Sequence, residues 1–183
     1  SWRSQQPDRT WEATAIEWIH DPQRPVARLI AASWLTSGRQ NSAAKRALDE
    51  LAVGRSDDWI RQLAAAQLWR MKAATVPLEQ VQRWQAALAR LPFELQGGPT
   101  FVVAGSLARH AQTDAAVLAY LRVAWLFGDG EPLAAESLWS ASQLLVKSDR
   151  TVEAVRLCQE LTERHATSTW AAEAERFLQE QRK

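Results

Sequence analysis

The stretch SQLLVKSDRTVEA, residues 142–154, decides the fold: it has the pattern of one helix ending, a Ser-Asp turn and a second helix. The small residue Ala154 falls on the inner face of that second helix. Small side chains recur at the matching point of three earlier helices, and the four positions are 37, 35 and 38 residues apart: Ala44, Val81, Ala116 and Ala154. A period of this size is typical of stacked helix pairs. One pair cannot bury its own apolar face, so the pairs must pack on one another and form an elongated stack with a groove.

The composition agrees with a soluble, all-helical chain. Good helix formers dominate the middle of the 183 residues, whereas glycine and proline number seven each and fall mostly between the periodic segments. A chain of this length can bury roughly 70% of its unfolded surface, which is enough for one domain. We therefore expect an all-α protein with a single domain over residues 1–183. That domain could be divided into a degenerate part, 1–91, and a more regular part, 99–183.

Proline, glycine and capping residues divide the chain into segments whose apolar residues have helical spacing. We expect an opening helix over 9–19, followed by four antiparallel pairs. The predicted pairs are 25–37 with 43–53, 56–74 with 77–90, 99–111 with 113–127, and 131–147 with 150–165. A charged, amphipathic helix over 168–181 would cap the C-terminal end of the stack. The longest break, 91–100, is rich in proline and glycine and is interpreted as a loop over the stack or as a hinge.

The C-terminal part of the chain resembles tetratricopeptide repeats. That family has a small residue in the first helix, an apolar residue three positions later, a turn, and an alanine where the two helices cross. Ser142, Leu145, the turn at 148–149 and Ala154 follow this order. Gly105 and Ala116 approximate it one pair earlier. The resemblance implies an α-solenoid with a right-handed superhelical twist.

The resemblance is uneven along the chain. It is good over 112–181, fair over 25–53 and poor over 56–110. Trp69 stands where the family has a small residue, so the second pair is expected to cross at a different angle. The alternative to a regular superhelix is a looser array of helical hairpins. Residues 165–174, HATSTWAAEA, resemble the junction between repeats in bacterial cell-envelope proteins, although His165 and Ala166 stand where that junction has an aromatic residue and a proline.

The family resemblance also implies where a partner would bind, since the first helix of each pair lines the concave face. Six groove residues are singled out, and Leu29, Ser33, Ala66 and Gly105 would lie beside them: Arg70, Phe101, Arg109, Trp139, Gln143 and Lys147. Arginine presents a planar fork to carboxylate oxygens, so this lining would suit a peptide with acidic side chains or a terminal carboxylate. The alternative is that the three cations are simply solvated.

Ten tryptophans are unusual in a chain of this length. Large rigid rings fill wide gaps between helices, which accounts for most of them without any binding role. Tryptophan is also over-represented among the residues that dominate binding energy. One or two could therefore line the groove, and Trp139 is the best candidate.

No set of residues has the pattern of a catalytic, metal or cofactor site. His20, His110 and His165 each fall near a predicted helix C-terminus, where the helix dipole favours a cation, and none has a metal-ligand partner at helical spacing. Cys158 lies on an apolar helix face and is interpreted as a small core residue. As the single cysteine, it also excludes an intramolecular disulfide and a cysteine-rich zinc site. We expect no cofactor and no enzymatic activity.

Charge and hydropathy limit the classes of partner that the sequence favours. Lys and Arg number 22 against 21 for Asp and Glu, so nothing favours nucleic acid. There is no apolar run of eighteen residues, so no segment is expected to enter a membrane. The chain begins at Ser1 rather than Met, so we expect an upstream segment, with a membrane anchor or a further domain in it. With the envelope-repeat resemblance, this favours the bacterial cell envelope and leaves the cytoplasm open.

The sequence therefore predicts a non-catalytic scaffold that binds a protein or peptide partner in its groove. The alternative is a regulatory or substrate-docking domain of a larger enzyme, or a helical domain that binds a small ligand. A pocket with convergent polar groups, in place of an open groove, would favour that alternative.

Overall fold

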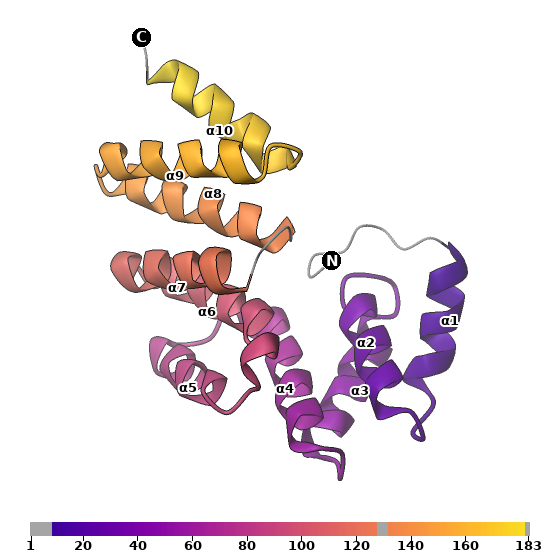
Figure 1. Cartoon of the computed structure of the whole chain (residues 1–183). Helices are drawn as coiled ribbons and strands as arrows, with labels where there is room; N and C mark the ends of the chain where they lie inside the picture. Colours follow the sequence, from indigo (N-terminus) through magenta and orange to yellow (C-terminus); the bar gives the residue numbers. More distant parts are fainter. Residues whose placement is uncertain (1–8, 128–131, 182–183) are drawn as a thin grey trace.

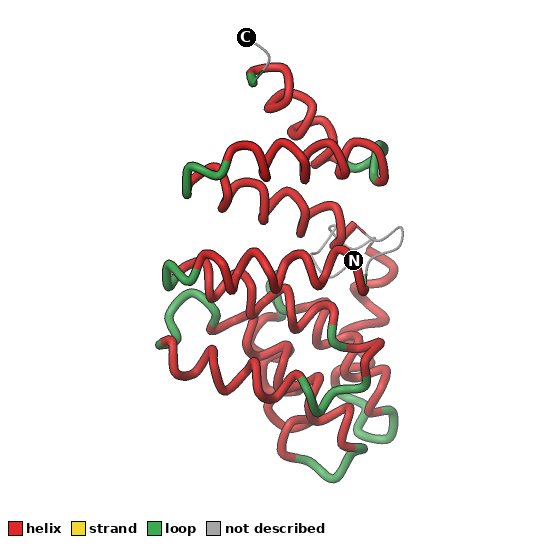
Figure 2. The backbone as a smooth tube through the Cα atoms, turned by 60° about the vertical axis from the view of Figure 1, so that its left-hand side comes forward, coloured by secondary structure: helices red, strands yellow, loops and turns green. Residues whose placement is uncertain are grey.

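The computed structural model describes residues 9–127 and 132–181, and these residues form ten α-helices, one short 3₁₀ helix and no strand (Figure 1, Figure 2). The all-α prediction is confirmed for this part of the chain. The elements are α1 (Arg9–Ile19), α2 (Pro25–Leu35), α3 (Asn41–Val53), α4 (Asp58–Lys72), α5 (Leu78–Leu88), η1 (Phe93–Leu95), α6 (Gly97–Arg109), α7 (Thr113–Leu126), α8 (Pro132–Lys147), α9 (Thr151–Arg164) and α10 (Thr169–Glu180). Residue 131, the expected start of the eighth helix, lies outside the described residues.

Proline and small polar residues set most helix starts. Pro25 occupies the first turn of α2, where its missing N–H has no intrahelical partner to lose. The Ser168 hydroxyl caps α10 by accepting a hydrogen bond from the Ala171 backbone N–H at 3.1 Å. These local signals explain why nearly all predicted boundaries fall within two residues of the observed ones.

The break at 91–100 differs from the prediction. Pro92 is followed by η1, and α6 begins at Gly97, so Gly97, Gly98 and Pro99 form the first turn of a helix. A Cβ atom on Gly97 would lie 2.9 Å from the Cβ of Phe127, so the glycine permits a close approach between the start of α6 and the end of α7. Residues 91–100 are therefore not a loop throughout, since η1 and the first turn of α6 lie within them, and the hinge stays a prediction.

The four small residues that reveal the period occupy equivalent positions. Ala44, Val81, Ala116 and Ala154 are each the fourth residue of their helix, in α3, α5, α7 and α9, and each is fully buried. A small side chain at this point lets the backbone of a neighbouring helix come close. The period of these small residues in the sequence therefore corresponds to the repeat of close helix contacts in the structure.

Helix contacts are local along the chain. All the closely packed pairs among the described helices are one or two helices apart in sequence. The first helices of the predicted pairs also contact one another in order, from α2 to α4, α6, α8 and α10. In Figure 1, α7 to α10 lie in layers above α4 to α6, and α1 to α3 lie on the other side of α4.

The second pair departs from this pattern. The backbones of α4 and α5 barely approach each other, whereas every other two consecutive α-helices pack closely. The Trp69 ring of α4 stacks on the Trp84 ring of α5, with centroids 5.2 Å apart and planes 11° from parallel. These two indoles fill the space between the helices. The expectation that Trp69 changes how this pair packs is consistent with this arrangement.

The buried apolar residues form three clusters in sequence order. One joins α1 to α4 around Leu48 and Ile60, a second joins α4 to α7 around Val81 and Val103, and a third joins α6 to α10 around Leu138. Each cluster contains residues from neighbouring helices only. The described residues are therefore not arranged around one central core.

Candidate functional site

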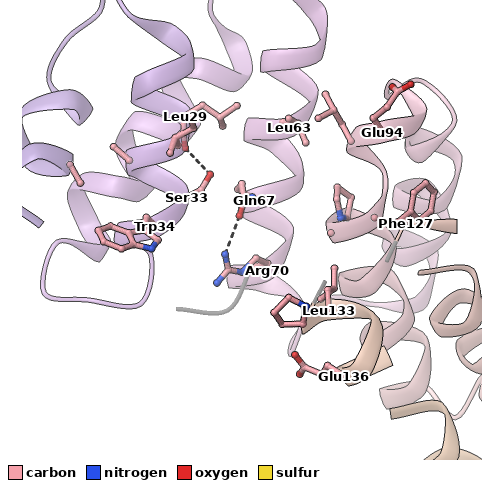
Figure 3. A pocket seen from close by; sticks show the side chains of 18 of the residues that line it. Leu29, Ser33, Trp34, Leu63, Gln67, Arg70, Glu94, Phe127, Leu133 and Glu136 are labelled. Carbon is pink, nitrogen blue, oxygen red and sulfur yellow. Dashed lines mark hydrogen bonds between the residues drawn. The ribbon is translucent and has the colours of Figure 1, made fainter. Parts of the chain in front are cut away.

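A hollow of about 800 Å³ lies between the N-terminal helices and the C-terminal layers (Figure 3). We call it the hollow. Its lining comes from α1, α2, α4, the segment 94–99, the end of α7, the start of α8, and α10: Trp11, Ala15, Trp18, Leu29, Ile30, Ala31, Ser33, Trp34, Leu63, Gln67, Arg70, Glu94, Leu95, Gly97, Gly98, Pro99, Phe127, Pro132, Leu133, Glu136 and Trp170. Residues up to about 160 positions apart in the sequence thus share one site.

One wall of the hollow is aromatic. The Trp11 ring packs against Trp18 with centroids 6.2 Å apart at 76°, and against Trp34 with centroids 6.4 Å apart at 79°. The helical spacing explains the set, because Trp11, Ala15 and Trp18 follow one face of α1 at intervals of four and three residues. Trp11 is 56% exposed and Ile30 of α2 is 58% exposed, so large apolar side chains remain open to solvent here.

The floor of the hollow is polar. Leu63, Gln67 and Arg70 follow one face of α4 at intervals of four and three residues. The Arg70 guanidinium donates a hydrogen bond to the Gln67 side-chain oxygen, with Nη1 and Oε1 3.2 Å apart (Figure 3). Gln67 lines the hollow with only 6% of its surface exposed. Ser33 in the adjacent wall donates its hydroxyl to the Leu29 carbonyl oxygen at 2.7 Å.

The opposite wall combines apolar and acidic side chains. Leu133 and Glu136 are three residues apart on the first turns of α8, and both line the hollow beside Phe127 (Figure 3). Phe127 packs on Phe93 of η1, with ring centroids 4.8 Å apart. Glu136 is buried although it carries a carboxylate, whereas Glu94 is exposed at the rim.

Of the six groove residues singled out from the sequence, Arg70 lines the hollow and the other five do not. Phe101 is buried and packs edge-on against Tyr120, with centroids 5.3 Å apart, so its ring belongs to the core. Trp139 stacks on Trp170 with centroids 6.5 Å apart, and Trp170 does line the hollow. Trp139 thus contacts a ring of the lining without being part of it.

The remaining three lie toward the end of α6 and along α8. Arg109 donates from Nε and Nη2 to the Ala73 carbonyl oxygen, at 3.1 and 2.8 Å, and so joins the ends of α6 and α4. Gln143 is half-buried in α8, and Lys147 is exposed in its last turn. The expected cluster of three cations in one concavity is therefore not part of this hollow. Leu29 and Ser33, which were expected beside the groove, do line it.

Sequence analysis missed the three tryptophans of the aromatic wall as site residues. The excess of tryptophan was noticed, and Trp11 and Trp18 fall on one face of the opening helix. However, α1 precedes the predicted pairs, so the pattern of groove positions did not extend to it. Trp34 was missed for another reason. It directly follows the expected groove position Ser33, and successive residues of a helix project in different directions, so the pattern selected Ser33 alone.

Two other titratable residues, His110 and Cys158, have contacts that are typical of structural roles. His110 follows the end of α6, and its Nε2 atom lies 2.8 Å from the Val76 carbonyl oxygen. Burial raises the pKa of the Cys158 thiol, and a hydrogen bond with Ser142 partly offsets the rise. Within residues 9–127 and 132–181, no three His, Cys, Asp or Glu side chains are grouped to hold a metal ion. None of the described helices is long and apolar enough to cross a membrane.

Comparison of the chain with known protein families, with characterised proteins and with solved structures finds no match. The interpretation of the site therefore depends on its own geometry and chemistry.

Proposed function

We propose that this chain is a non-catalytic interaction domain that binds a peptide segment of a partner protein in the hollow. The observation that carries the proposal is the exposed apolar surface of the hollow. Trp11 of the aromatic wall and Ile30 of α2 both line it, and each is more than half exposed. Large exposed apolar side chains that adjoin polar groups are typical of binding surfaces. Tryptophan and arginine, which dominate binding energy in many interfaces, occur together in this lining.

We also propose that the helices form a tetratricopeptide-like α-solenoid with a right-handed twist, in which α10 caps the end. The equivalent burial of Ala44, Val81, Ala116 and Ala154 supports this proposal, as does the ordered contact from α2 to α10. The capped start of α10 at Ser168 supports the resemblance of this junction to bacterial cell-envelope repeats. A hollow on the side of such a stack is where a partner chain would be held.

Site-specific photo-crosslinking tests the proposal. A photoreactive residue is placed at Ile30, inside the hollow, and in a second protein at Val53, which is 86% exposed and lies outside it. We expect a partner that is crosslinked from position 30 and not from position 53. Its affinity for Trp11→Ser should fall at least tenfold, and its affinity for Trp125→Ser should not change. Trp125 is a matched control because it is 50% exposed and lies outside the lining.

Two results would contradict the proposal. The same proteins could be crosslinked from both positions, or a partner recovered at position 30 could bind Trp11→Ser as well as the wild type. Either result would show that the hollow is not the binding surface.

Small-molecule binding is the second candidate. The volume of the hollow, about 800 Å³, falls within the range of small-ligand pockets, about 300 to 1,000 Å³. Side chains of Gln67, Arg70 and Glu136 converge on it, as such a pocket requires. A thermal-shift screen against a metabolite library would favour this candidate if a compound stabilises the wild type and Trp125→Ser but not Trp11→Ser.

A further inference from the structure

We propose that the hollow recognises a basic side chain of the bound peptide, an arginine or a lysine, whose cation lies against the rings of Trp11, Trp18 and Trp34. This inference rests on the proposed function, because it assumes that a peptide enters the hollow. It differs from the acidic peptide that the sequence suggested.

The geometry of the three tryptophan rings is suited to binding a cation. Trp11 meets both Trp18 and Trp34 nearly at right angles, so each pair of rings forms a corner. A cation held in such a corner can face one ring while its apolar stem contacts the other. The face of an indole carries negative charge density, and a cation within about 6 Å of the centroid is attracted to it. Trp11 is 56% exposed in the absence of a ligand, so its ring has surface left to cover.

The charges of the lining favour the same sign. Among the described residues of the lining, Glu94 and Glu136 carry carboxyl groups and Arg70 carries a guanidinium. Glu94 is exposed, so its charge is open to a ligand. Arg109 and Lys147, the other two cations on which an acidic ligand would depend, lie outside the hollow. A basic ligand therefore complements the lining better than an acidic one.

The size of the hollow leaves room for a peptide on both sides of the cation. At about 800 Å³ the hollow can enclose a drug-sized ligand, so one side chain would leave most of it empty. Residues on both sides of the arginine or lysine could occupy the rest.

Single amino acids with blocked termini test which sign of ligand charge the hollow prefers, and this test does not require the partner to be known. The probes are arginine, citrulline and glutamate, each acetylated at the N-terminus and methylamidated at the C-terminus. Citrulline has nearly the shape of arginine and no charge. Binding is followed by the indole N–H signals of the folded chain in two-dimensional NMR, assigned with single Trp→Phe variants.

We expect the arginine probe to shift the indole signals of Trp11, Trp18 and Trp34, and to bind about 3- to 30-fold more tightly than the citrulline probe. Trp11→Leu should lower this preference and Trp125→Leu should keep it. Glu94→Gln should weaken the arginine probe and leave the citrulline probe unchanged. The comparison of probes on the wild type needs no variant, so it stands even if Trp11→Leu fails to fold.

Equal affinity for arginine and citrulline at these rings would overturn the cationic assignment while the hollow remained a binding site. Tighter binding of glutamate would overturn it in favour of an acidic peptide. Absence of any shift at the three rings would overturn it as well. The proposed function fails by a different result, namely a crosslinked partner whose affinity does not depend on the hollow.

Discussion

The stacked pair of Trp69 and Trp84 gives the sharpest test of how the second helix pair is held. Trp84 is 4% exposed, and a buried tryptophan removes about 150 to 250 Å² from water. At about 25 cal/mol per Å², this area corresponds to about 4 to 6 kcal/mol. Truncation of buried tryptophans costs about 3 to 5 kcal/mol, so we expect Trp84→Ala to lower the free energy of unfolding by about 4 kcal/mol.

The contribution of the stacking itself requires a double-mutant cycle. Trp69 is half-buried, so Trp69→Ala should cost less than Trp84→Ala, about 2 kcal/mol. Parallel rings with centroids 5.2 Å apart should add about 1 kcal/mol beyond their buried area. The loss in Trp69→Ala/Trp84→Ala should therefore be smaller than the sum of the two single losses by about that amount.

Urea unfolding followed by circular dichroism at 222 nm measures all four free energies, since the helical backbone dominates this signal. Trp84→Ala combined with Trp139→Ala is the matched control, because these two rings lie in different clusters and their losses should add. If Trp84→Ala does not fold, Trp84→Phe completes the cycle with a smaller loss. Strict additivity for Trp69 and Trp84 would refute the view that their stacking joins α4 to α5.

Three further outcomes follow from single sites. Gly97→Ala should lower the free energy of unfolding, measured in urea, by about 1 to 3 kcal/mol, because the added Cβ would lie 2.9 Å from the Cβ of Phe127. An unchanged stability would show that the two segments are not in close contact. Burial raises the pKa of the Cys158 thiol in the folded state, so its contribution to stability is fully present below the unfolded pKa and is lost as pH rises through the folded pKa. Cys158→Ala should therefore lose less stability than the wild type between neutral pH and pH 10 or above, and parallel urea curves at all pH values would contradict this. Arg109→Ala should cost about 1 kcal/mol because the carbonyl at the end of α4 loses its donors, whereas Lys147→Ala should cost almost nothing; equal losses in thermal or urea unfolding would remove the structural role of Arg109.

Local features of this fold could be predicted from the sequence because their causes are local. Capping residues and helix breakers act over a few residues, so the expected helix 113–127 and the observed α7, Thr113–Leu126, differ by one residue. The small residues at the helix contacts repeat with the helix pairs, so Ala116 and Ala154 were recognised as equivalent. Gly97 was misjudged because a glycine required by a neighbouring ring looks the same in sequence as a glycine in a loop.

The hollow could not be predicted in the same way, since it depends on how successive helix pairs are rotated against each other. Helical spacing gives the residues that share a face, and it does not give the direction in which that face points. The family pattern placed Phe101 in the groove, whereas the structure places it against Tyr120 in the core. Trp34 and Trp170 line one site because the path of the whole chain brings α2 and α10 to the same side.

The local character of the helix contacts has a consequence for how the chain folds. Since the closely packed helices are at most two apart in sequence, few contacts require the closure of a long loop. Proteins with such low contact order fold within microseconds to milliseconds. We expect several helix pairs to nucleate independently and the ordered region to spread from each toward both ends, so that a nascent chain acquires native packing before its synthesis is complete.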